Sequence, residues 1–127
     1  MFKILVVDDS KTVHAFIRNL KLPQKFTLNS VFNGEEALKH LAESNTNYDL
    51  VLLDWEMPIL NGPETLKQLS DLNYKTPVIM MTTKNNPEDI AYAINLGASE
   101  YIMKPFDVEI LLDKIKSVVD WEYENVS

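Results

Sequence analysis

The 127-residue sequence contains no cysteine, only three glycines and no apolar run of membrane-spanning length. Without cysteine the chain can form no disulfide and no thiolate metal site, which is typical of proteins kept in a reducing compartment. The first residues, Met1-Phe2-Lys3, lead into a strand-like pattern and not into the apolar segment of a signal peptide. We therefore expect a cytoplasmic protein that does not insert into a membrane.

Glycine-rich and strongly basic segments are missing as well. No glycine spacing is followed by Lys-Ser or Lys-Thr, which argues against a phosphate loop that binds nucleotides. Twelve Lys and Arg face 19 Asp and Glu, so the formal net charge is -7 and binding to nucleic acid or anionic lipid is not expected. Partners should be proteins. The length fits one domain, residues 1–127, with no room for a second folded module.

The most informative stretch covers residues 49–58. Four consecutive aliphatic residues, Leu50 to Leu53, indicate a strand that is buried on both faces, because a strand with one wet face would alternate apolar and polar side chains. The run stops at Asp54. Open α/β sheets bind their ligands beyond the carboxyl ends of parallel strands, so Asp54 is the first candidate for chemistry.

Three further apolar runs end in polar side chains. The residues that follow them are Asp8-Asp9 after 4–7, Thr82-Thr83 after 78–81, and Lys104 after 101–103. If the strands are parallel neighbours, these side chains meet. One acidic residue at a strand end is usually a solvated loop residue, but a cluster of carboxylates repels itself unless a cation enters, and Mg²⁺ prefers such oxygen ligands. A carboxylate can also attack a phosphoryl group.

Five strand-like runs alternate with five helix-like segments. The strands are expected at 4–7, 26–32, 50–53, 78–81 and 101–103. Helices are expected to start at Ser10, with Pro23 ending the first, at Asn33-Gly34, at Pro63, at Asn86-Pro87 and at Val108. This alternation predicts a parallel α/β sheet covered by helices on both faces through right-handed crossovers. Residues 26–32 mix polar and apolar side chains, which favours the sheet edge.

The first helix has an apolar stripe at the spacing i, i+3, i+4, i+7. Its members are Val13, Phe16, Ile17 and Leu20. His14 and His40 fall on predicted helices and have no His, Cys or acidic partner at ligand spacing. We therefore interpret both as surface histidines.

The motifs together resemble the receiver domains of two-component response regulators, over essentially the whole chain. They are Val6–Ser10, Asp54 followed by Met57-Pro58 and Asn61-Gly62, Thr82, and Lys104–Phe106. The resemblance implies a flavodoxin-like, doubly wound fold with a five-stranded parallel sheet in the strand order 2-1-3-4-5. Because Trp55 follows Asp54 and no output domain is expected, the chain is most similar to the stand-alone chemotaxis members of the family.

The resemblance also implies the roles of the acidic residues. Asp54 is the phosphoacceptor. Asp9 and Asp54 bind Mg²⁺ directly, Asp8 helps through water, and the backbone carbonyl of Glu56 is a further ligand; Mn²⁺ can substitute. The donor is a phosphohistidine on a sensor histidine kinase or a histidine phosphotransfer protein.

Other implied roles lie on the next two strands. The Thr82 hydroxyl and the Lys104 ammonium contact the phosphoryl group, and Tyr101 is the aromatic residue of the switch. The Lys104-Pro105 bond is expected to be cis. Three residues are expected to flank the opening and tune access to it, with the first and last able to pair: Glu56, Thr83 and Lys84.

The implied function is that of a phosphorylation-operated switch, not of an enzyme with a released product. Its target is expected to be a protein such as a flagellar switch component, and a phosphatase is a possible further partner. The partner surface is expected to contain Ile90, Ile94, Tyr101 and Lys114, with both isoleucines exposed.

Three alternatives remain open from the sequence. The first is an intermediate phosphocarrier in a multistep phosphorelay. The second is an aspartate-nucleophile phosphatase of the haloacid dehalogenase type, although that class usually has Asp where this chain has Glu56. The third is a flavin binder of the same fold class, which the charge of Asp8-Asp9 disfavours.

Overall fold

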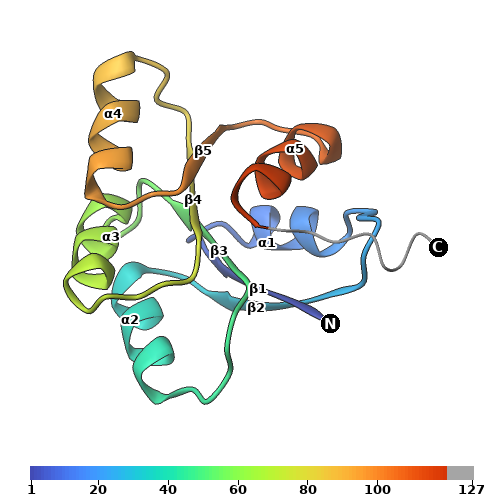
Figure 1. The fold of residues 1–127 in the computed structure, drawn as a ribbon, viewed down its shortest axis with the longest axis horizontal. Helices are drawn as coiled ribbons and strands as arrows, with labels where there is room; N and C mark the ends of the chain where they lie inside the picture. The colour runs from blue at the N-terminus through green and yellow to red at the C-terminus, as the bar shows by residue number, and fades with distance from the viewer. Residues whose placement is uncertain (120–127) are drawn as a thin grey trace.

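The predicted alternation of strands and helices forms a single parallel sheet with helices on both faces in the computed structural model, which describes residues 1–119 (Figure 1). In chain order the elements are β1 (Phe2–Val7), α1 (Lys11–Arg18), β2 (Phe26–Val31), α2 (Gly34–Glu43), β3 (Leu50–Asp54), α3 (Gly62–Asp71), β4 (Val78–Thr82), α4 (Pro87–Leu96), β5 (Glu100–Met103) and α5 (Val108–Val118). The strand order is β2-β1-β3-β4-β5, and every neighbouring pair is parallel. The predicted fold class and strand order are confirmed.

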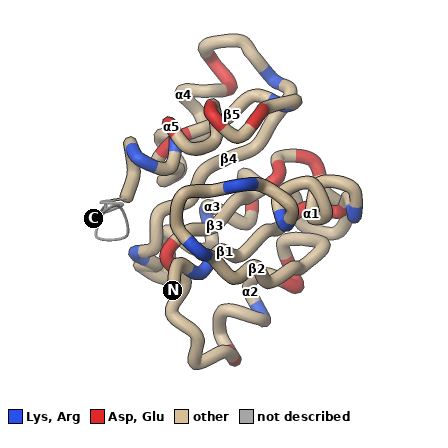
Figure 2. Tube along the Cα trace, turned by 90° about the vertical axis from the view of Figure 1, so that its right-hand side faces the viewer, with Lys and Arg blue, Asp and Glu red and all other residues tan. Residues whose placement is uncertain are grey.

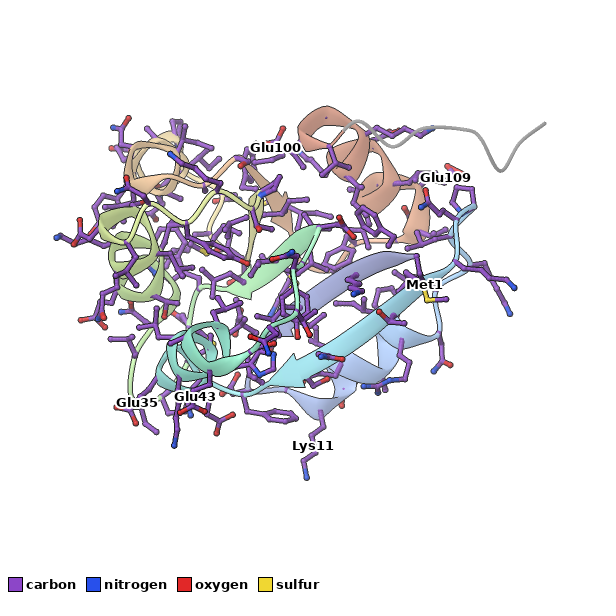
Figure 3. All side chains as sticks on the ribbon, turned by 60° about the horizontal axis from the view of Figure 1, so that its bottom comes forward. Met1, Lys11, Glu35, Glu43, Glu100 and Glu109 are labelled. Carbon is purple, nitrogen blue, oxygen red and sulfur yellow. The ribbon has the colours of Figure 1, made fainter. Side chains whose placement is uncertain are left out.

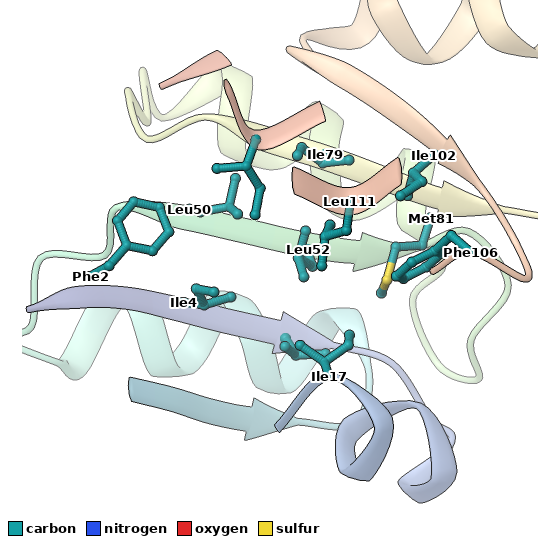
Figure 4. Close-up of a cluster of buried hydrophobic side chains, with 12 residues drawn as sticks. Phe2, Ile4, Ile17, Leu50, Leu52, Ile79, Met81, Ile102, Phe106 and Leu111 are labelled. Carbon is teal, nitrogen blue, oxygen red and sulfur yellow. The ribbon is translucent and has the colours of Figure 1, made fainter. Parts of the chain in front are cut away.

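The sheet separates two hydrophobic clusters. One lies under α1 and α5 and includes Leu52 of β3 and Leu111 of α5; Figure 4 shows it between the sheet and these two helices. The other lies under α2, α3 and α4 and includes Leu53 and Leu66. Consecutive residues of a strand point to opposite faces, and helices cover both faces, so β3 is buried throughout. The edge strand β2 alternates in burial instead, as predicted.

Capping residues fix where each helix starts, and therefore how long each loop at the carboxyl edge of the sheet is. The cap residues whose side chains accept a backbone N–H three residues later are Ser10, Asn33, Asn61, Asn86 and Asp107. At Asn61 the bond is reciprocal, since the Glu64 side chain also accepts from the Asn61 N–H. All five loops that leave the carboxyl ends of the strands are thus closed by a polar cap.

The first helix ends earlier than predicted. Pro23 was expected to end it, but α1 stops at Arg18. The Asn19 side chain donates to the carbonyl of Ala15 at 2.9 Å, a local bond that competes with continued helix. The chain then crosses to β2 through a seven-residue connection.

Charged side chains lie mainly on the outer faces of the helices and in the loops. Figure 2 shows Lys and Arg mixed with Asp and Glu along several elements, and Figure 3 shows Lys11, Glu35 and Glu109 extending from α1, α2 and α5. In the part of the chain that the structure describes, no helix has the length and apolar character needed to span a bilayer. Among residues 1–119 the acidic side chains that are buried are those of Asp8 and Asp54, at the carboxyl edge of the sheet.

Candidate functional site

Parallel pairing brings the ends of the central strands to one edge of the sheet. Val7 pairs with Leu53, and Asp54 pairs with Met81. Asp8 therefore follows β1, next to Asp54 at the end of β3 and Thr82 at the end of β4. All three are buried, with relative exposures of 1%, 6% and 4%. The sequence-based grouping of these residues is therefore what the structure shows, and Lys104 joins them from the end of β5.

The ammonium of Lys104 lies between two carboxylates. Its Nζ is 2.8 Å from Asp54 Oδ1 and 2.9 Å from Asp8 Oδ2. Burial lowers the pKa of Lys104, but the hydrogen bonds to Asp54 and Asp8 outweigh this effect and raise the pKa above its ordinary value. Lys104 therefore stays charged and fixes the two carboxylates from the β5 side.

The carboxylate cluster fits a divalent cation. Ligand oxygens of Asp8, Asp9 and Asp54 lie within 4.8 Å of one another. Burial raises the pKa of Asp54 to about 6; Lys104 opposes the rise, and the charges of Asp8 and Asp9 add to it. One ammonium does not neutralise three carboxylates, and oxygen donors are the ligands that Mg²⁺ and Mn²⁺ prefer. The oxygen ligands of this cluster and its net negative charge are thus suited to Mg²⁺ or Mn²⁺.

A small cavity of about 200 Å³ opens beside Asp54 and is lined by Trp55, Glu56, Thr82, Thr83 and Lys104. The Thr82 hydroxyl accepts a hydrogen bond from the Lys84 N–H at 2.9 Å. Glu56 Oε2 and Lys84 Nζ are 3.9 Å apart, so the predicted pair between them is present at the rim. Because the Glu56 side chain is 78% exposed, this pair contributes little to stability.

The loop after β3 is held tightly against the strand end. The Gly62 N–H donates to the carbonyl of Trp55 at 2.8 Å, and a Cβ at Gly62 would lie 2.4 Å from the carbonyl oxygen of Asp54. Only glycine allows this close approach. Directly after β5, the Lys104-Pro105 bond is cis, as predicted.

The residues of the expected partner surface lie away from the carboxylates. Tyr101 is half-buried, and Lys114 Nζ is 4.5 Å from the centroid of its ring and 3.4 Å from Glu100 Oε1. Ile94 is 41% exposed, in agreement with the prediction, but Ile90 is only partly exposed. The structure thus places Tyr101 and Lys114 in contact and gives a smaller apolar surface than expected.

The interpretation of His14 as a surface residue was wrong. His14 is 3% exposed, and its Nε2 is 2.8 Å from the backbone oxygen of Asp8. Phe16, expected to be buried, is 43% exposed, whereas Ile17 is fully buried and Val13 and Leu20 pack against the cluster under α1 and α5, so His14 takes the place of Phe16 in the buried stripe. His40 is half-buried, with Nε2 2.6 Å from the Tyr48 hydroxyl. The only signal for His14 in the sequence is its position one turn after Ser10, on the face that also carries Ile17.

Comparison with known proteins identifies a family. The family model described as "Response regulator receiver domain" matches residues 4–116. The chain is 37% identical over 119 residues to Response regulator ArlR of Staphylococcus saprophyticus, covering 94% of this chain and 53% of that protein. It is also 37% identical to Transcriptional regulatory protein CpxR of Escherichia coli K12, covering 94% of this chain and 50% of that protein. The chain thus spans about half the length of the curated relatives it matches.

Solved structures agree with this assignment. The chemotaxis protein CheY4 of Vibrio cholerae superimposes with a TM-score of 0.82 at 30% identity, covering 94% of this chain and 99% of that one. The receiver domain of the Francisella response regulator 1452 gives a TM-score of 0.78 at 29% identity and covers both chains completely. Similarity therefore extends to proteins of the same length and to longer regulators.

Proposed function

Because this chain belongs to the response regulator receiver domain family, we propose that Asp54 accepts a phosphoryl group from a phosphohistidine of a sensor histidine kinase or a histidine phosphotransfer protein. The observation that carries the proposal is the position of Asp54. It is a buried carboxylate beside a cavity, hydrogen-bonded to Lys104 and grouped with two further carboxylates. An Asp54 oxygen forms a bond to phosphorus, and the bond from phosphorus to the donor nitrogen breaks, leaving its electron pair on that nitrogen.

The neighbouring residues supply charge and orientation for this transfer. Asp8, Asp9, Asp54 and the carbonyl of Glu56 would hold Mg²⁺ or Mn²⁺, which would supply positive charge to the phosphoryl oxygens when bound. Lys104 already contacts Asp54 and would contact a phosphoryl oxygen attached to it. The Thr82 hydroxyl lines the same cavity and would donate to another oxygen. Glu56, Thr83 and Lys84 surround the opening and would tune access of donor and water.

Phosphorylation would act by shifting the population of conformations that the chain already samples. The Thr82 hydroxyl would turn toward the phosphoryl group and leave the Lys84 N–H to which it is now bonded. Tyr101 would then turn inward, changing the surface that contains Ile90, Ile94, Tyr101 and Lys114. This makes the chain a switch that assists its own modification, and a partner phosphatase could shorten the lifetime of the phosphoryl group.

For the output we propose chemotaxis, through a protein target such as a flagellar switch component. Similarity to CheY4 over nearly its whole chain supports this. Regulation of transcription is the second candidate, supported by the similarity to CpxR. A role as a phosphorelay carrier is compatible with the same site. Each of these three functions would take place in the cytoplasm, where ATP provides the phosphoryl group that the kinase passes on.

Labelling with acetyl phosphate tests the phosphoacceptor. Wild-type protein with Mg²⁺ is expected to take up acid-stable, base-labile label, and Asp54→Asn is expected to take up none, because the amide is not a nucleophile. Asp71→Asn is the control, since the Asp71 side chain is exposed and pairs with Lys67 on the surface. Label on Asp54→Asn equal to that on wild type would refute the assignment. Transfer from a panel of histidine kinases identifies the donor, and binding of the phosphorylated protein to flagellar switch proteins tests the chemotaxis output.

A further inference from the structure

We propose that His14 is a positioning residue for the divalent cation site, holding the peptide that joins Asp8 to Asp9. The inference rests on the proposed function only in placing the cation at Asp8, Asp9 and Asp54. Because the oxygen of Asp8 is a carbonyl and can only accept, His14 Nε2 carries the hydrogen and donates it across 2.8 Å. The bond runs from the middle of α1 to the loop after β1.

His14 is an unfavourable choice for a residue that serves packing alone. Its ring lies against Phe32, with centroids 4.6 Å apart, and is 3% exposed. Among the described residues, Nδ1 is buried without a hydrogen-bond partner. Burying an acceptor without a partner costs free energy, whereas phenylalanine would fill the same space without that cost. What histidine adds over phenylalanine is the donor to Asp8.

The bond from His14 completes the fixation of Asp8. The Asp8 N–H donates to Val31 at 3.2 Å, Oδ1 accepts from the Ser10 N–H at 2.8 Å, and Oδ2 accepts from Lys104 at 2.9 Å. Side chain and N–H are thus held by other groups. Among residues 1–119, the His14 bond alone fixes the carbonyl, and with it the plane of the peptide that leads into Asp9.

The position of the Asp9 carboxylate depends on this backbone, because the side chain itself has no partner among the described residues. Its side chain is exposed, and it makes no hydrogen bond or ion pair with any residue in the range 1–119. The peptide is planar, so the direction of the Asp8 carbonyl also sets the direction in which the Asp9 backbone leaves. If the plane rotates, the Asp9 carboxylate moves away from the oxygens of Asp8 and Asp54, which now lie within 4.8 Å of it. His14 therefore prearranges the cation ligands.

Three substitutions of His14 distinguish the effects of its hydrogen-bond donor, of its length and of its ring volume. His14→Gln places an amide nitrogen near the position of Nε2 and keeps a donor to Asp8. His14→Asn is shorter and cannot reach the carbonyl. His14→Phe keeps the ring against Phe32 without any donor. Ile17→Val is the matched control, because Ile17 is fully buried on the same helix and touches the core instead of the loop.

The measurement is the Mg²⁺ dissociation constant from Trp55 fluorescence, together with the thermal unfolding midpoint in EDTA. His14→Phe and His14→Asn are expected to weaken Mg²⁺ binding about tenfold, as loss of residues that orient metal ligands typically does. His14→Gln should bind within about twofold of wild type, and Ile17→Val should lower the midpoint without changing the dissociation constant.

Wild-type affinity in His14→Phe, or equal affinity in the Gln and Asn variants, would overturn the proposal. If His14→Phe does not fold, the Gln and Asn pair decides the question. Asp9→Ala separates this inference from the proposed function. When Asp9→Ala loses Mg²⁺ binding and His14→Phe does not, only the role of His14 fails; when Asp9→Ala also binds normally, the cation site itself is misplaced.

Discussion

Neutralising Asp54 is expected to stabilise the metal-free protein near pH 8, although it removes the proposed phosphoacceptor. The cause is the raised pKa of Asp54, which reaches about 6 in the folded chain because the carboxylate is buried and lies near Asp8 and Asp9. In the unfolded chain the value returns to the ordinary 3.8. Between these values the folded protein binds more protons than the unfolded one, so stability falls as pH rises through about 6.

The size of the effect follows from the same two values. A rise from 3.8 to about 6, at about 1.4 kcal/mol for each pKa unit, makes ionised Asp54 destabilising by roughly 3 kcal/mol above pH 6. Asparagine keeps the shape and removes the charge, but its hydrogen bond with Lys104 is weaker than that of a carboxylate. We therefore expect Asp54→Asn to raise the free energy of unfolding by about 1–3 kcal/mol near pH 8. The gain should disappear below about pH 4.

Urea unfolding in EDTA, followed by circular dichroism between about pH 4 and pH 8, measures this difference. Asp71→Asn serves as the control, because its side chain is 66% exposed and little pH-dependent change is expected. Mg²⁺ should stabilise wild type more than Asp54→Asn, since an ion that binds only the folded state adds more stability when it binds more tightly. An Asp54→Asn protein that is less stable than wild type near pH 8, or a gain that does not change with pH, would refute the reasoning.

The remaining predictions concern the cation, the loop after β3 and the output surface. Asp9→Ala should weaken the Mg²⁺ response of Trp55 fluorescence strongly, and a titration identical to wild type would place the ion elsewhere. Gly62→Ala should destabilise the fold by about 1–3 kcal/mol in urea unfolding, because its Cβ would overlap a backbone carbonyl, and an unchanged midpoint would contradict this. Beryllofluoride should raise affinity for the target, and a rise that survives both Ile94→Asp and Lys114→Glu would remove this face from the output surface.

The carboxyl edge of the sheet could be predicted because its signals are local and strong. Continuous apolar runs mark the interior strands β3 and β4, which the structure places at Leu50–Asp54 and Val78–Thr82, and the first polar residue after each run, Asp54 or Thr82, belongs to the site. The strand order could not be predicted in this way. Many strand orders are compatible with the same apolar runs, so the order 2-1-3-4-5 came from the family resemblance and not from the sequence pattern. The contact of Lys114 with the Tyr101 ring could not be predicted from the sequence either, because it depends on how α5 packs against β5.

The replacement of Phe16 by His14 in the buried stripe of α1 explains why the site could be assigned while the residue that holds its Asp8 carbonyl could not. A helix of eight residues makes just over two turns, so a buried stripe through Ile17 can include either Phe16 or His14. Hydrophobicity alone favours Phe16. The deciding factor is the carbonyl of Asp8, which is buried after β1 and needs a donor, and His14 supplies one at 2.8 Å. Apolar periodicity contains no information about which backbone groups a fold leaves without partners. Side chains that serve the backbone of a binding loop therefore become recognisable only when strand ends and helix starts are placed together.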